Sequence, residues 1–248
     1  MKYMGSKRLL KKDILPILQR IIDEHGIKKY IEPFVGGANI IDSIKCEKKI
    51  GSDINPYLIE LFRHIEDVKG MPDFISHEEY SRVRESYNKR NDDFPDWYKG
   101  AVGFLSSYNG RFFDGGYSGC RTTNGKTRNY FLECKNNILK QSVKLTDIEW
   151  NIGDYAALYS DVSNALIYCD IPYKNTTHYG AFKFFNYDRF WHWARQMSKN
   201  NIVIISEQTA PSDFEPIWTK EITRFVRAVK KIKATESLFR IAGATWKI

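Results

Sequence analysis

The feature that constrains the fold most strongly is a set of short apolar segments that each end in polar residues or glycines. Residues 201–208 (NIVIISEQ) form a continuous apolar run, which is typical of a parallel strand that is covered on both faces. Residues 165–173 (ALIYCDIPY) predict a strand that runs into a polar turn. Residues 28–37 (KKYIEPFVGG) and 48–55 (KKIGSDIN) repeat this pattern near the start. The sequence therefore predicts an α/β domain with parallel strands.

Helical patterns lie next to these strands. Residues 9–23 place apolar side chains on one helical face, with Pro16 near the first turn or at a kink. Residues 39–45 and 56–65 predict two further helices, and residues 187–199 predict an amphipathic one. The alternation of strand and helix supports the α/β class.

The α/β pattern stops after about residue 65 and returns near residue 147. The interruption is rich in Asn, Gly, Arg and Tyr and has few apolar runs of strand length. It predicts, in order, helices over 77–89 and 97–105, a loop over 106–129 and two helical pieces over 130–145. We therefore expect one domain built from residues 1–65 and 147–248, with an insertion at 66–146. At the end of the chain, ITRFVRAVKKIK and ESLFRIAG predict an antiparallel pair of strands.

The composition excludes several classes of protein. Apolar residues make up 42% and charged residues 27%, as in ordinary globular proteins. No apolar run reaches the roughly 18–20 residues that span a bilayer, and the start lacks a secretory signal, so we expect a soluble intracellular (cytoplasmic) protein. The 4 cysteines form no C-x-x-C pair, which predicts no structural metal. A net charge of +8 favours a polyanionic partner, nucleic acid first.

Two features at the ends of the first two strands indicate a nucleotide-like ligand. Gly36 and Gly37 lie at a strand–helix junction, where a ligand can approach the backbone closely. Asp53 follows Gly36 at close to the spacing of about 20 residues at which α/β nucleotide folds hold ribose hydroxyls. The glycines could instead form a simple tight turn, and Asp53 could cap the helix that begins near Pro56.

The most specific stretch is YCDIPYKNT, residues 168–176. An acid, a proline and an aromatic residue stand together at the carboxyl end of a predicted strand, where open α/β sheets place their ligands. The alternative is a polar exit from the strand with a structural proline.

These stretches together resemble the Dam-like (D12 class) family of adenine-N6-specific DNA methyltransferases. DIPY resembles the family's D-P-P-Y signature, EPFVGG its cofactor-binding glycine turn, and KYMGSKRLL its lysine-bearing opening segment. SDINPYLIELF is similar to the acidic segment after the second strand, and YNGRFF to part of the DNA-recognition insertion. The resemblance runs from residue 2 to about residue 199, with the stretches in the family's order. It implies a Rossmann-like, S-adenosylmethionine-dependent methyltransferase sheet with an inserted, mostly helical and loop target-recognition domain.

The resemblance also implies a set of cofactor-binding residues. Lys7 is expected near the carboxylate of the cofactor's methionine end, which gives a reason for a cation there. Asp53 is expected to take the ribose hydroxyls, and Asp154 the amino group of the cofactor adenine, with Tyr155 beside that ring. The full implied set is Tyr3, Lys7, Pro33, Phe34, Gly36, Gly37, Asp53, Ile54, Asp154, Tyr155 and Asp170.

The implied catalytic turn is Asp170, Ile171, Pro172 and Tyr173. Asp170 and the carbonyl of Ile171 would each accept one N6–H of an adenine that has been flipped out of the duplex, and Tyr173 would stack on that base. Ile171 stands where the family usually has proline. The chemistry needs only a backbone carbonyl there, and Pro172 biases Ile171 toward an extended backbone. No metal is required.

The insertion is expected to recognise double-stranded DNA. Arginine suits the O6/N7 edge of guanine and asparagine the N6/N7 edge of adenine, although each such side chain could contact phosphate or solvent instead. The residues are Asn109, Arg111, Arg121, Asn124, Lys126 and Arg128. Two alternatives stay open, a cytosine-N4 methyltransferase and a non-catalytic DNA-binding relic. The resemblance also allows a cognate restriction endonuclease as a partner.

Overall fold

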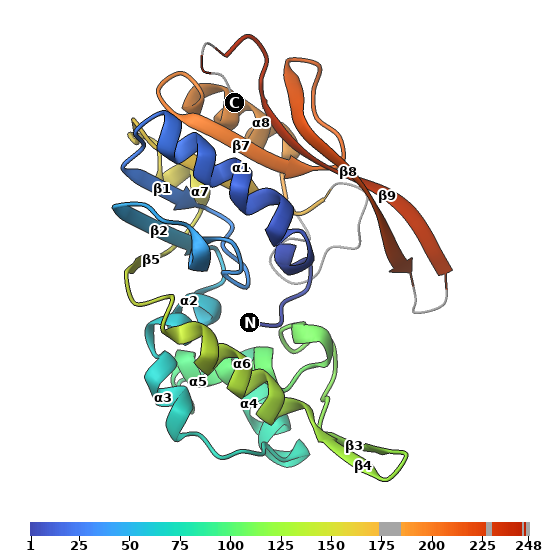
Figure 1. The fold of residues 1–248 in the computed structure, drawn as a ribbon. Helices are drawn as coiled ribbons and strands as arrows, with labels where there is room; N and C mark the ends of the chain where they lie inside the picture. The colour runs from blue at the N-terminus through green and yellow to red at the C-terminus, as the bar shows by residue number, and fades with distance from the viewer. Residues whose placement is uncertain (174–184, 227–229, 245, 247–248) are drawn as a thin grey trace.

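The computed structural model describes residues 1–173, 185–226, 230–244 and 246. In the described part of the chain, a seven-stranded sheet has the spatial order β5-β2-β1-β6-β7-β9-β8. The strands are β1 (Lys29–Glu32), β2 (Lys48–Asp53), β5 (Ile148–Ile152), β6 (Leu166–Asp170), β7 (Ile202–Glu207), β8 (Phe214–Val226) and β9 (Lys230–Ile241). Figure 1 shows the sheet in one half of the molecule and a group of helices in the other, with the N-terminus between them.

The first five strands of the sheet are parallel, and β9 and β8 are added antiparallel to β7 and to each other. The chain starts at β1, extends on one side to β2 and β5, and returns on the other side to β6 and β7. Strand β1 is therefore the point where the strand order reverses, and ligands bind in the crevice at such a point. The structure confirms the α/β class and the Rossmann-like arrangement.

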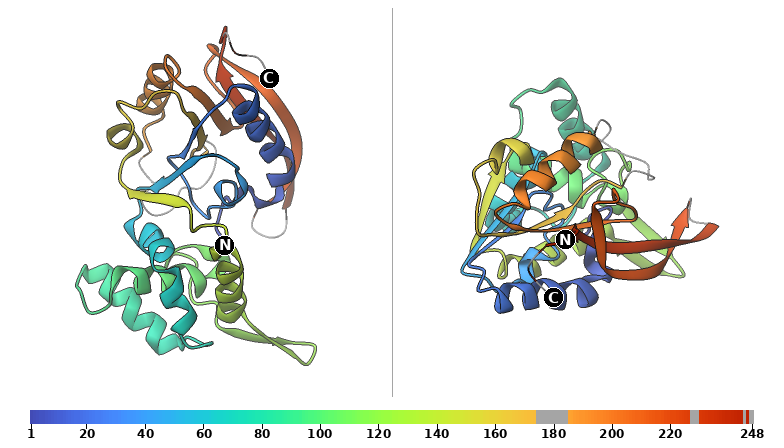
Figure 2. Two further views of the ribbon diagram at one scale, coloured as in Figure 1. Left: turned by 60° about the vertical axis from the view of Figure 1, so that its left-hand side comes forward. Right: turned by 90° about the horizontal axis from the view of Figure 1, so that it is seen from above.

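Helices cover both faces of the sheet. Helix α1 (Lys11–Glu24) lies on one face, whereas α7 (Tyr155–Leu158) and α8 (Tyr187–Met197) lie on the other, as the view from above in Figure 2 shows. In β6 and β7, Leu166 and Ile204 pack in the cluster that includes α1. Their neighbours Ile167 and Val203 pack in the cluster that includes α8. Alternate residues of one strand are therefore buried on opposite faces, which explains the continuous apolar runs.

The other half of the molecule contains α2 (Pro56–Arg63), α3 (Ile65–Gly70), α4 (His77–Lys89), α5 (Asp96–Leu105) and α6 (Tyr130–Ser142). Buried side chains of these helices belong to the same apolar cluster as α1 and one face of the sheet. Helices α2 and α5 approach most closely at Gly100, where a Cβ would lie 2.1 Å from the carbonyl oxygen of Tyr57. The helices expected over 77–89 and 97–105 are confirmed, the second beginning one residue earlier.

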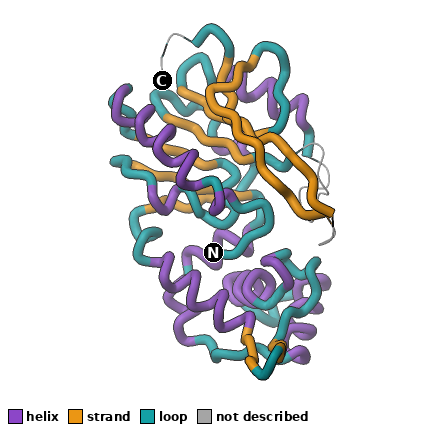
Figure 3. The backbone as a smooth tube through the Cα atoms, turned by 45° about the vertical axis from the view of Figure 1, so that its right-hand side comes forward, coloured by secondary structure: helices purple, strands orange, loops and turns teal. Residues whose placement is uncertain are grey.

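The stretch expected to be a loop contains a β-hairpin, and this part of the sequence prediction is wrong. Strands β3 (Cys120–Thr123) and β4 (Lys126–Asn129) pair antiparallel across a two-residue turn. Asn124 and Gly125 in this turn have φ angles of 52° and 72°. Asn-Gly is the strongest short-range hairpin signal because both residues tolerate positive φ, and it was present in the sequence. Figure 3 shows the hairpin projecting beyond the helices.

Three smaller predictions also need correction. The two helical pieces expected over 130–145 are one helix, α6, which ends at Ser142, and residues 143–145 form a turn. Residues 39–45 contain only a 3-10 turn, η2 (Ile41–Ser43), because β-branched Ile is a weak helix former and Gln141 bonds the carbonyls of Gly37 and Ala38. A terminal antiparallel pair is present, but its strands differ from those expected: residues 222–226 belong to β8 and pair with residues 230–234 of β9.

Among the described residues, no helix is long and apolar enough to cross a membrane.

Candidate active site

The candidate site lies where the carboxyl ends of β1, β2 and β6 meet. Asp53 ends β2 and Asp170 ends β6, the two strands that flank β1. The N-terminal segment crosses this edge: Tyr3 lies against Gly36, and the 3-10 turn η1 (Lys7–Leu9) brings Lys7 to Asp170. Residues from both halves of the chain therefore converge at the switch point of the sheet.

Asp170 is paired with Lys7. The Lys7 ammonium donates a hydrogen bond to Asp170 Oδ1 and lies 3.6 Å from Oε1 of Glu236, a residue of β9. The side chain of Asp170 is 22% exposed, while those of Lys7 and Glu236 are 7% and 1% exposed. Asp170 is thus the one member of this cluster that a ligand in solution can reach. The resemblance placed Lys7 near a cofactor carboxylate, and the structure gives it these two protein carboxylates as partners.

The turn after β6 is held at two points. The Tyr173 hydroxyl donates a hydrogen bond to Glu236 Oε1 and lies 3.3 Å from Ser206 Oγ. The Tyr187 hydroxyl donates to the Pro172 carbonyl at 2.8 Å. Ile171 is buried at 2% exposure, so its side chain anchors the turn to the core. The residues of YCDIPYKNT from Lys174 onward lie outside the described residues.

Tyr173 is itself buried, with 6% exposure, and the Lys7 ammonium lies 4.5 Å from its ring centroid. Burial, together with the negative charges of Asp170 and Glu236, holds the pKa of its hydroxyl well above the ordinary value. The hydroxyl therefore stays protonated and acts as a donor. One ring face is occupied by Lys7, so base stacking requires the other face or a movement of Lys7.

Asp53 is a buried carboxylate held by backbone amides. It is 2% exposed and accepts hydrogen bonds from Gly36 N at 3.3 Å and Asn55 N at 3.0 Å. Burial raises the pKa of Asp53 to about 6, against the opposing effect of these amide bonds. Within the described chain Asp53 forms no ion pair, so it presents an uncompensated acceptor at the edge of the sheet. Its neighbour Ile54 is 45% exposed.

The glycine turn is packed against the N-terminal segment. Gly36 has φ +47°, and a Cβ there would lie 2.9 Å from the Tyr3 ring. A Cβ on Gly37 would lie 2.5 Å from Asn39 Nδ2 and 2.9 Å from Tyr3 Cβ. Burial raises the pKa of Tyr3, and the charges of Asp53 and Asp170 add to the shift. Tyr3 therefore lies between the two predicted acidic groups.

A second aromatic group lies on the other face of the sheet. Phe34 and Tyr155 have ring centroids 5.1 Å apart, and both pack near Phe190 of α8. Asp154 caps α7 and forms a two-bond ion pair with Arg189, at 2.7 and 2.9 Å. In this structure the carboxylate of Asp154 is therefore occupied by a guanidinium and not free for an amino group. Pro33 is buried beside Phe34.

The predicted DNA-binding residues lie in two places. Arg121 and Arg128 are cross-strand partners in the β3–β4 hairpin, with Asn124 and Lys126 at its turn, and all four are exposed. Arg128 also pairs with Glu133 at 2.5 and 2.7 Å. The other two, Asn109 and Arg111, flank Gly110 in and after the 3-10 turn η3 (Tyr108–Gly110). A Cβ on Gly110 would meet the Lys2 carbonyl oxygen at 2.5 Å, which places η3 against the N-terminal segment.

Several residues of the site were missed by sequence reasoning. Glu236 and Ser206 are buried polar residues inside apolar strands, which is a signal of a functional or paired group. Gln141 on α6 is a third: its amide donates to the carbonyls of Gly37 and Ala38 and to Asp42. Gln141 therefore bonds the inserted helices directly to the glycine turn.

Glu32 at the end of β1 was also missed. It is 3% exposed and accepts a hydrogen bond from the Tyr30 hydroxyl at 2.7 Å. Burial raises the pKa of Glu32 to about 8, and the nearby charge of Asp170 contributes. The carboxyl edge of the sheet thus concentrates buried acidic groups.

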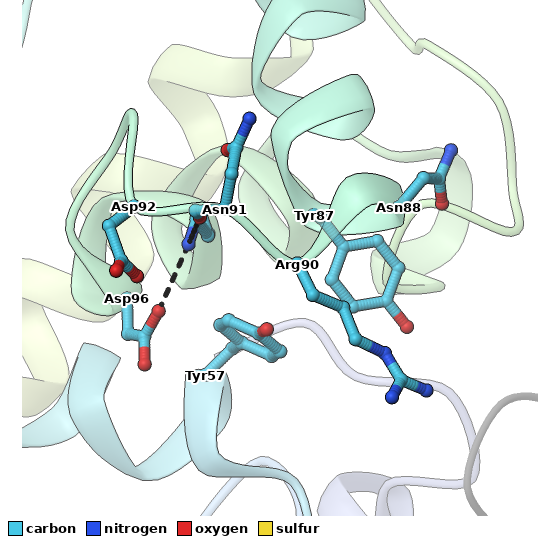
Figure 4. Close-up of a pocket in the computed structure, with 8 residues that line it drawn as sticks. Tyr57, Tyr87, Asn88, Arg90, Asn91, Asp92 and Asp96 are labelled. Carbon is cyan, nitrogen blue, oxygen red and sulfur yellow. Dashed lines mark hydrogen bonds and ion pairs between the residues drawn. The ribbon is translucent and has the colours of Figure 1, made fainter.

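A separate cavity of about 480 Å³ lies in the helical half of the molecule, between α2, α4 and α5 (Figure 4). The Lys99 ammonium donates to the Asn91 carbonyl at 2.7 Å and to Asp96 at 3.2 Å. The lining residues are Tyr57, Tyr87, Asn88, Arg90, Asn91, Asp92, Asp96 and Lys99. None of the predicted site residues lines this cavity, so it is distinct from the site at the sheet edge.

The strand order defines a Rossmann-like fold, and the candidate site is the charged turn at its switch point, at the ends of β1, β2 and β6. The sequence model of the D12 class N6 adenine-specific DNA methyltransferases matches residues 3–212. The chain therefore belongs to this family, and it is a site-specific, adenine-specific DNA methyltransferase.

Individual relatives agree with this assignment. The type II methyltransferase M.MjaIII of Methanocaldococcus jannaschii is 29% identical over 199 residues, which cover 70% of this chain and 68% of that protein. The modification methylase StsI of Streptococcus sanguinis is 28% identical over 195 residues, which cover 71% of this chain but only 29% of that protein. The solved structure of PH1948 from Pyrococcus horikoshii covers 96% of this chain and 84% of its own at 7% identity and a TM-score of 0.43. That similarity is too low to support a conclusion, and the fold assignment rests on the strand order.

Proposed function

We propose that the protein transfers a methyl group from S-adenosylmethionine to N6 of an adenine that is flipped out of double-stranded DNA. The observation that carries this proposal is the position of Asp170. It ends the strand beside the switch point, it is the exposed member of a buried charge cluster, and it opens the turn that resembles D-P-P-Y.

The residues at the ends of β1 and β2 fit the proposed cofactor. Asp53 offers a buried carboxylate without an ion-pair partner in the described structure, which suits two vicinal ribose hydroxyls. Phe34 and Tyr155, on the other face of the sheet, would offer aromatic surface for a purine ring. When bound, S-adenosylmethionine supplies an electrophilic methyl group on a sulfonium. Pro33, Gly36, Gly37 and Ile54 would form the backbone wall, and Tyr3 would close it.

Asp170 and the Ile171 carbonyl would act on the target amino group. An adenine amino nitrogen is a poor nucleophile because its lone pair is delocalised into the ring. Two acceptors would fix its hydrogens and stabilise the positive charge that develops on the nitrogen. As the nitrogen–carbon bond formed, the carbon–sulfur bond of the sulfonium would break and leave its electron pair on sulfur. Asp170 would then accept one N6 proton, which removes the positive charge from the methylated nitrogen. Lys7 donates to Asp170 Oδ1, so the carboxylate would be held in place by this ion pair while it binds the target amino group.

The inserted half would hold and read the DNA. The β3–β4 hairpin carries Arg121, Lys126 and Arg128 on an exposed two-stranded ribbon, and the major groove admits such a ribbon. A base inside the duplex cannot reach Asp170, so the target adenine has to leave the stack. Asn109 and Arg111 flank Gly110, which lies against Lys2. They would therefore lie beside the N-terminal segment that crosses the candidate site.

The names of the two relatives support further partners. A type II methyltransferase and a modification methylase are named for restriction–modification, so we include a cognate restriction endonuclease in the proposal. We also infer an intracellular site of action, since the substrate is DNA. The reaction as written requires no metal.

The test is methyl transfer from labelled S-adenosylmethionine to DNA, followed by single-molecule sequencing of DNA from cells that express the protein. We expect N6-methyladenine in one sequence context and none with the Asp170→Ala variant. N4-methylcytosine in the hydrolysed DNA would show that the enzyme methylates cytosine and not adenine. Tight DNA binding without any transfer would show a relic.

A further inference from the structure

Glu236 is a charged group with 1% exposure near the catalytic turn, and it lies outside residues 3–212, which the family's sequence model matches. It lies on β9, which runs antiparallel to β7 with Glu207 opposite Ser237. Glu236, the residue before Ser237, therefore lies at the carboxyl end of β7, on the proposed ligand-binding edge of the sheet. An antiparallel strand thus contributes a carboxylate to an edge that is otherwise built by parallel strands.

Three donors surround this carboxylate. The Tyr173 hydroxyl donates a hydrogen bond to Glu236 Oε1, Ser206 Oγ donates to the same oxygen at 2.9 Å, and the Lys7 ammonium lies 3.6 Å away. Burying a carboxylate to 1% exposure costs free energy unless a cation and hydrogen bonds compensate its charge. These contacts are therefore expected to hold Glu236 and its donors in one arrangement. Two of the three donors belong to the site described above.

Glu236 also changes what Lys7 does to Asp170. Here the ammonium lies between Asp170 and Glu236, so its charge is shared. The Asp170 side chain stays 22% exposed beside this pair, and the Tyr173 ring is held in one position because its hydroxyl is bonded to Glu236.

We propose that Glu236 is a positioning residue of the methyl-transfer site, which aligns Tyr173 and Lys7 and through them the Asp170 turn. This inference rests on the proposed function. Glu236 touches neither the base nor the cofactor in this proposal; it acts by fixing the groups that do.

The experiment compares Glu236→Gln with Glu221→Gln. Glu221 lies on β8 of the same hairpin, its side chain is 76% exposed, and its charge is removed by the same chemical change. Single-turnover methyl transfer is measured at saturating cofactor and DNA, with DNA affinity and urea unfolding measured in parallel. We expect Glu236→Gln to be slower by about tenfold and Glu236→Ala by about a hundredfold, since a misplacement near 1 Å has that effect. DNA affinity should stay unchanged, as should every property of Glu221→Gln.

A double-mutant cycle supplies a readout other than activity. If Glu236 acts through the Tyr173 hydroxyl, the unfolding free energies of Tyr173→Phe and Glu236→Gln will not add. Partial rescue by glutamine also separates positioning from folding, because the amide oxygen still accepts from Tyr173 but no longer holds Lys7.

The outcomes distinguish the two proposals. A wild-type protein that transfers no methyl group to DNA overturns the proposed function, and the role of Glu236 with it. An active wild type with an equally fast Glu236→Gln variant overturns only the role of Glu236. The role of Glu236 would also be overturned if the unfolding free energies of Tyr173→Phe and Glu236→Gln add and Glu236→Gln lowers only the stability of the protein.

Discussion

The carboxyl edge of the sheet and the β3–β4 hairpin both concentrate charged side chains, but they expose them to water to different extents. At the sheet edge, the side chains of Lys7 and Glu236 are 7% and 1% exposed. On the hairpin, the side chain of Arg128 is 56% exposed, and Arg121 and Lys126 are exposed as well. The two regions therefore use charge under different physical conditions.

Buried charges interact strongly and each needs its partner, so removing one is expected to disturb the whole cluster. Exposed charges are screened by salt and lose little when one is removed, so they suit attraction and adaptable contact with a polyanion. The sheet edge therefore suits fixed geometry, and the hairpin suits the proposed contact with DNA. This difference in exposure predicts large, salt-insensitive effects in the first region and smaller, salt-dependent effects in the second.

The largest effect is expected for Asp170→Ala. Methyl transfer should fall by about a thousandfold or more, equivalent to about 4 kcal/mol in the barrier, because Asp170 acts on the reacting nitrogen. The fold should survive because Lys7 keeps Glu236 as a partner. Single-turnover transfer of labelled methyl groups measures the loss, with the exposed Asp161→Ala as control. Wild-type turnover in Asp170→Ala would contradict the mechanism.

Asp53→Asn should weaken cofactor binding and stabilise the free protein at the same time. The neutral amide loses the acceptor for one ribose hydroxyl, so we expect about a hundredfold lower affinity, or about 2.7 kcal/mol. Burial raises the pKa of Asp53 to about 6, so at pH 7 the ionised carboxylate destabilises the fold. Calorimetry and urea unfolding at pH 7 measure both changes. Equal affinity in the variant would remove Asp53 from the cofactor site.

Glu32→Gln should change the pH dependence of stability. Burial raises the pKa of Glu32 to about 8, so between pH 6 and 8 the folded chain holds a proton that the unfolded chain has released. Stability then falls as the pH rises, by about 2 kcal/mol over this window, and Glu32→Gln should lack that fall. The Met1 amine, whose pKa burial lowers to about 6, gives the opposite slope.

The measurement is therefore the difference between the wild-type and Glu32→Gln unfolding free energies across a pH series, since the Met1 contribution is the same in both. Parallel curves for the two proteins would show that Glu32 is not protonated in the fold.

Arg121→Ala tests the exposed region. If Arg121 reads a base, DNA affinity should fall by about 1–3 kcal/mol and selectivity should relax at one position of the site. A phosphate contact would instead lower affinity for every sequence and reduce the salt dependence by about one unit. Binding titrations at several salt concentrations separate the two, with Arg84→Ala on α4 as an exposed control. Unchanged affinity and selectivity would remove the hairpin from the interface.

The smallest effect is expected for Ile171→Pro. The proposed role needs only the backbone carbonyl, so activity should stay within about tenfold, or about 1.4 kcal/mol of barrier. Ile171 is buried at 2% exposure, so urea unfolding is measured beside the transfer rate to account for lost packing. A large gain in rate would show that Ile171 weakens the natural enzyme.

The parallel α/β sheet could be predicted because each strand that is buried on both faces is a continuous apolar run in the sequence. The ends of β2 and β6 fall on Asp53 and Asp170, the residues at which the apolar runs stop. The hairpin was also predictable, from Asn124-Gly125, but the abundance of glycine and asparagine around it was interpreted as loop. The turn η2 was not, since its conformation depends on Gln141 from a distant helix.

By itself, the sequence determined the order of the main strands and helices, the interruption of the α/β pattern and the acidic residues that end β2 and β6. These features depend on hydrophobic periodicity and turn chemistry, which act over a few residues. Only the tertiary structure decided which charges share one cluster. Lys7 meets Asp170 across 163 positions and Glu236 meets Tyr173 across 63. Such contacts depend on how all the elements pack together, which places β9 beside β7 and the N-terminal segment across the sheet edge. No local sequence pattern predicts that packing.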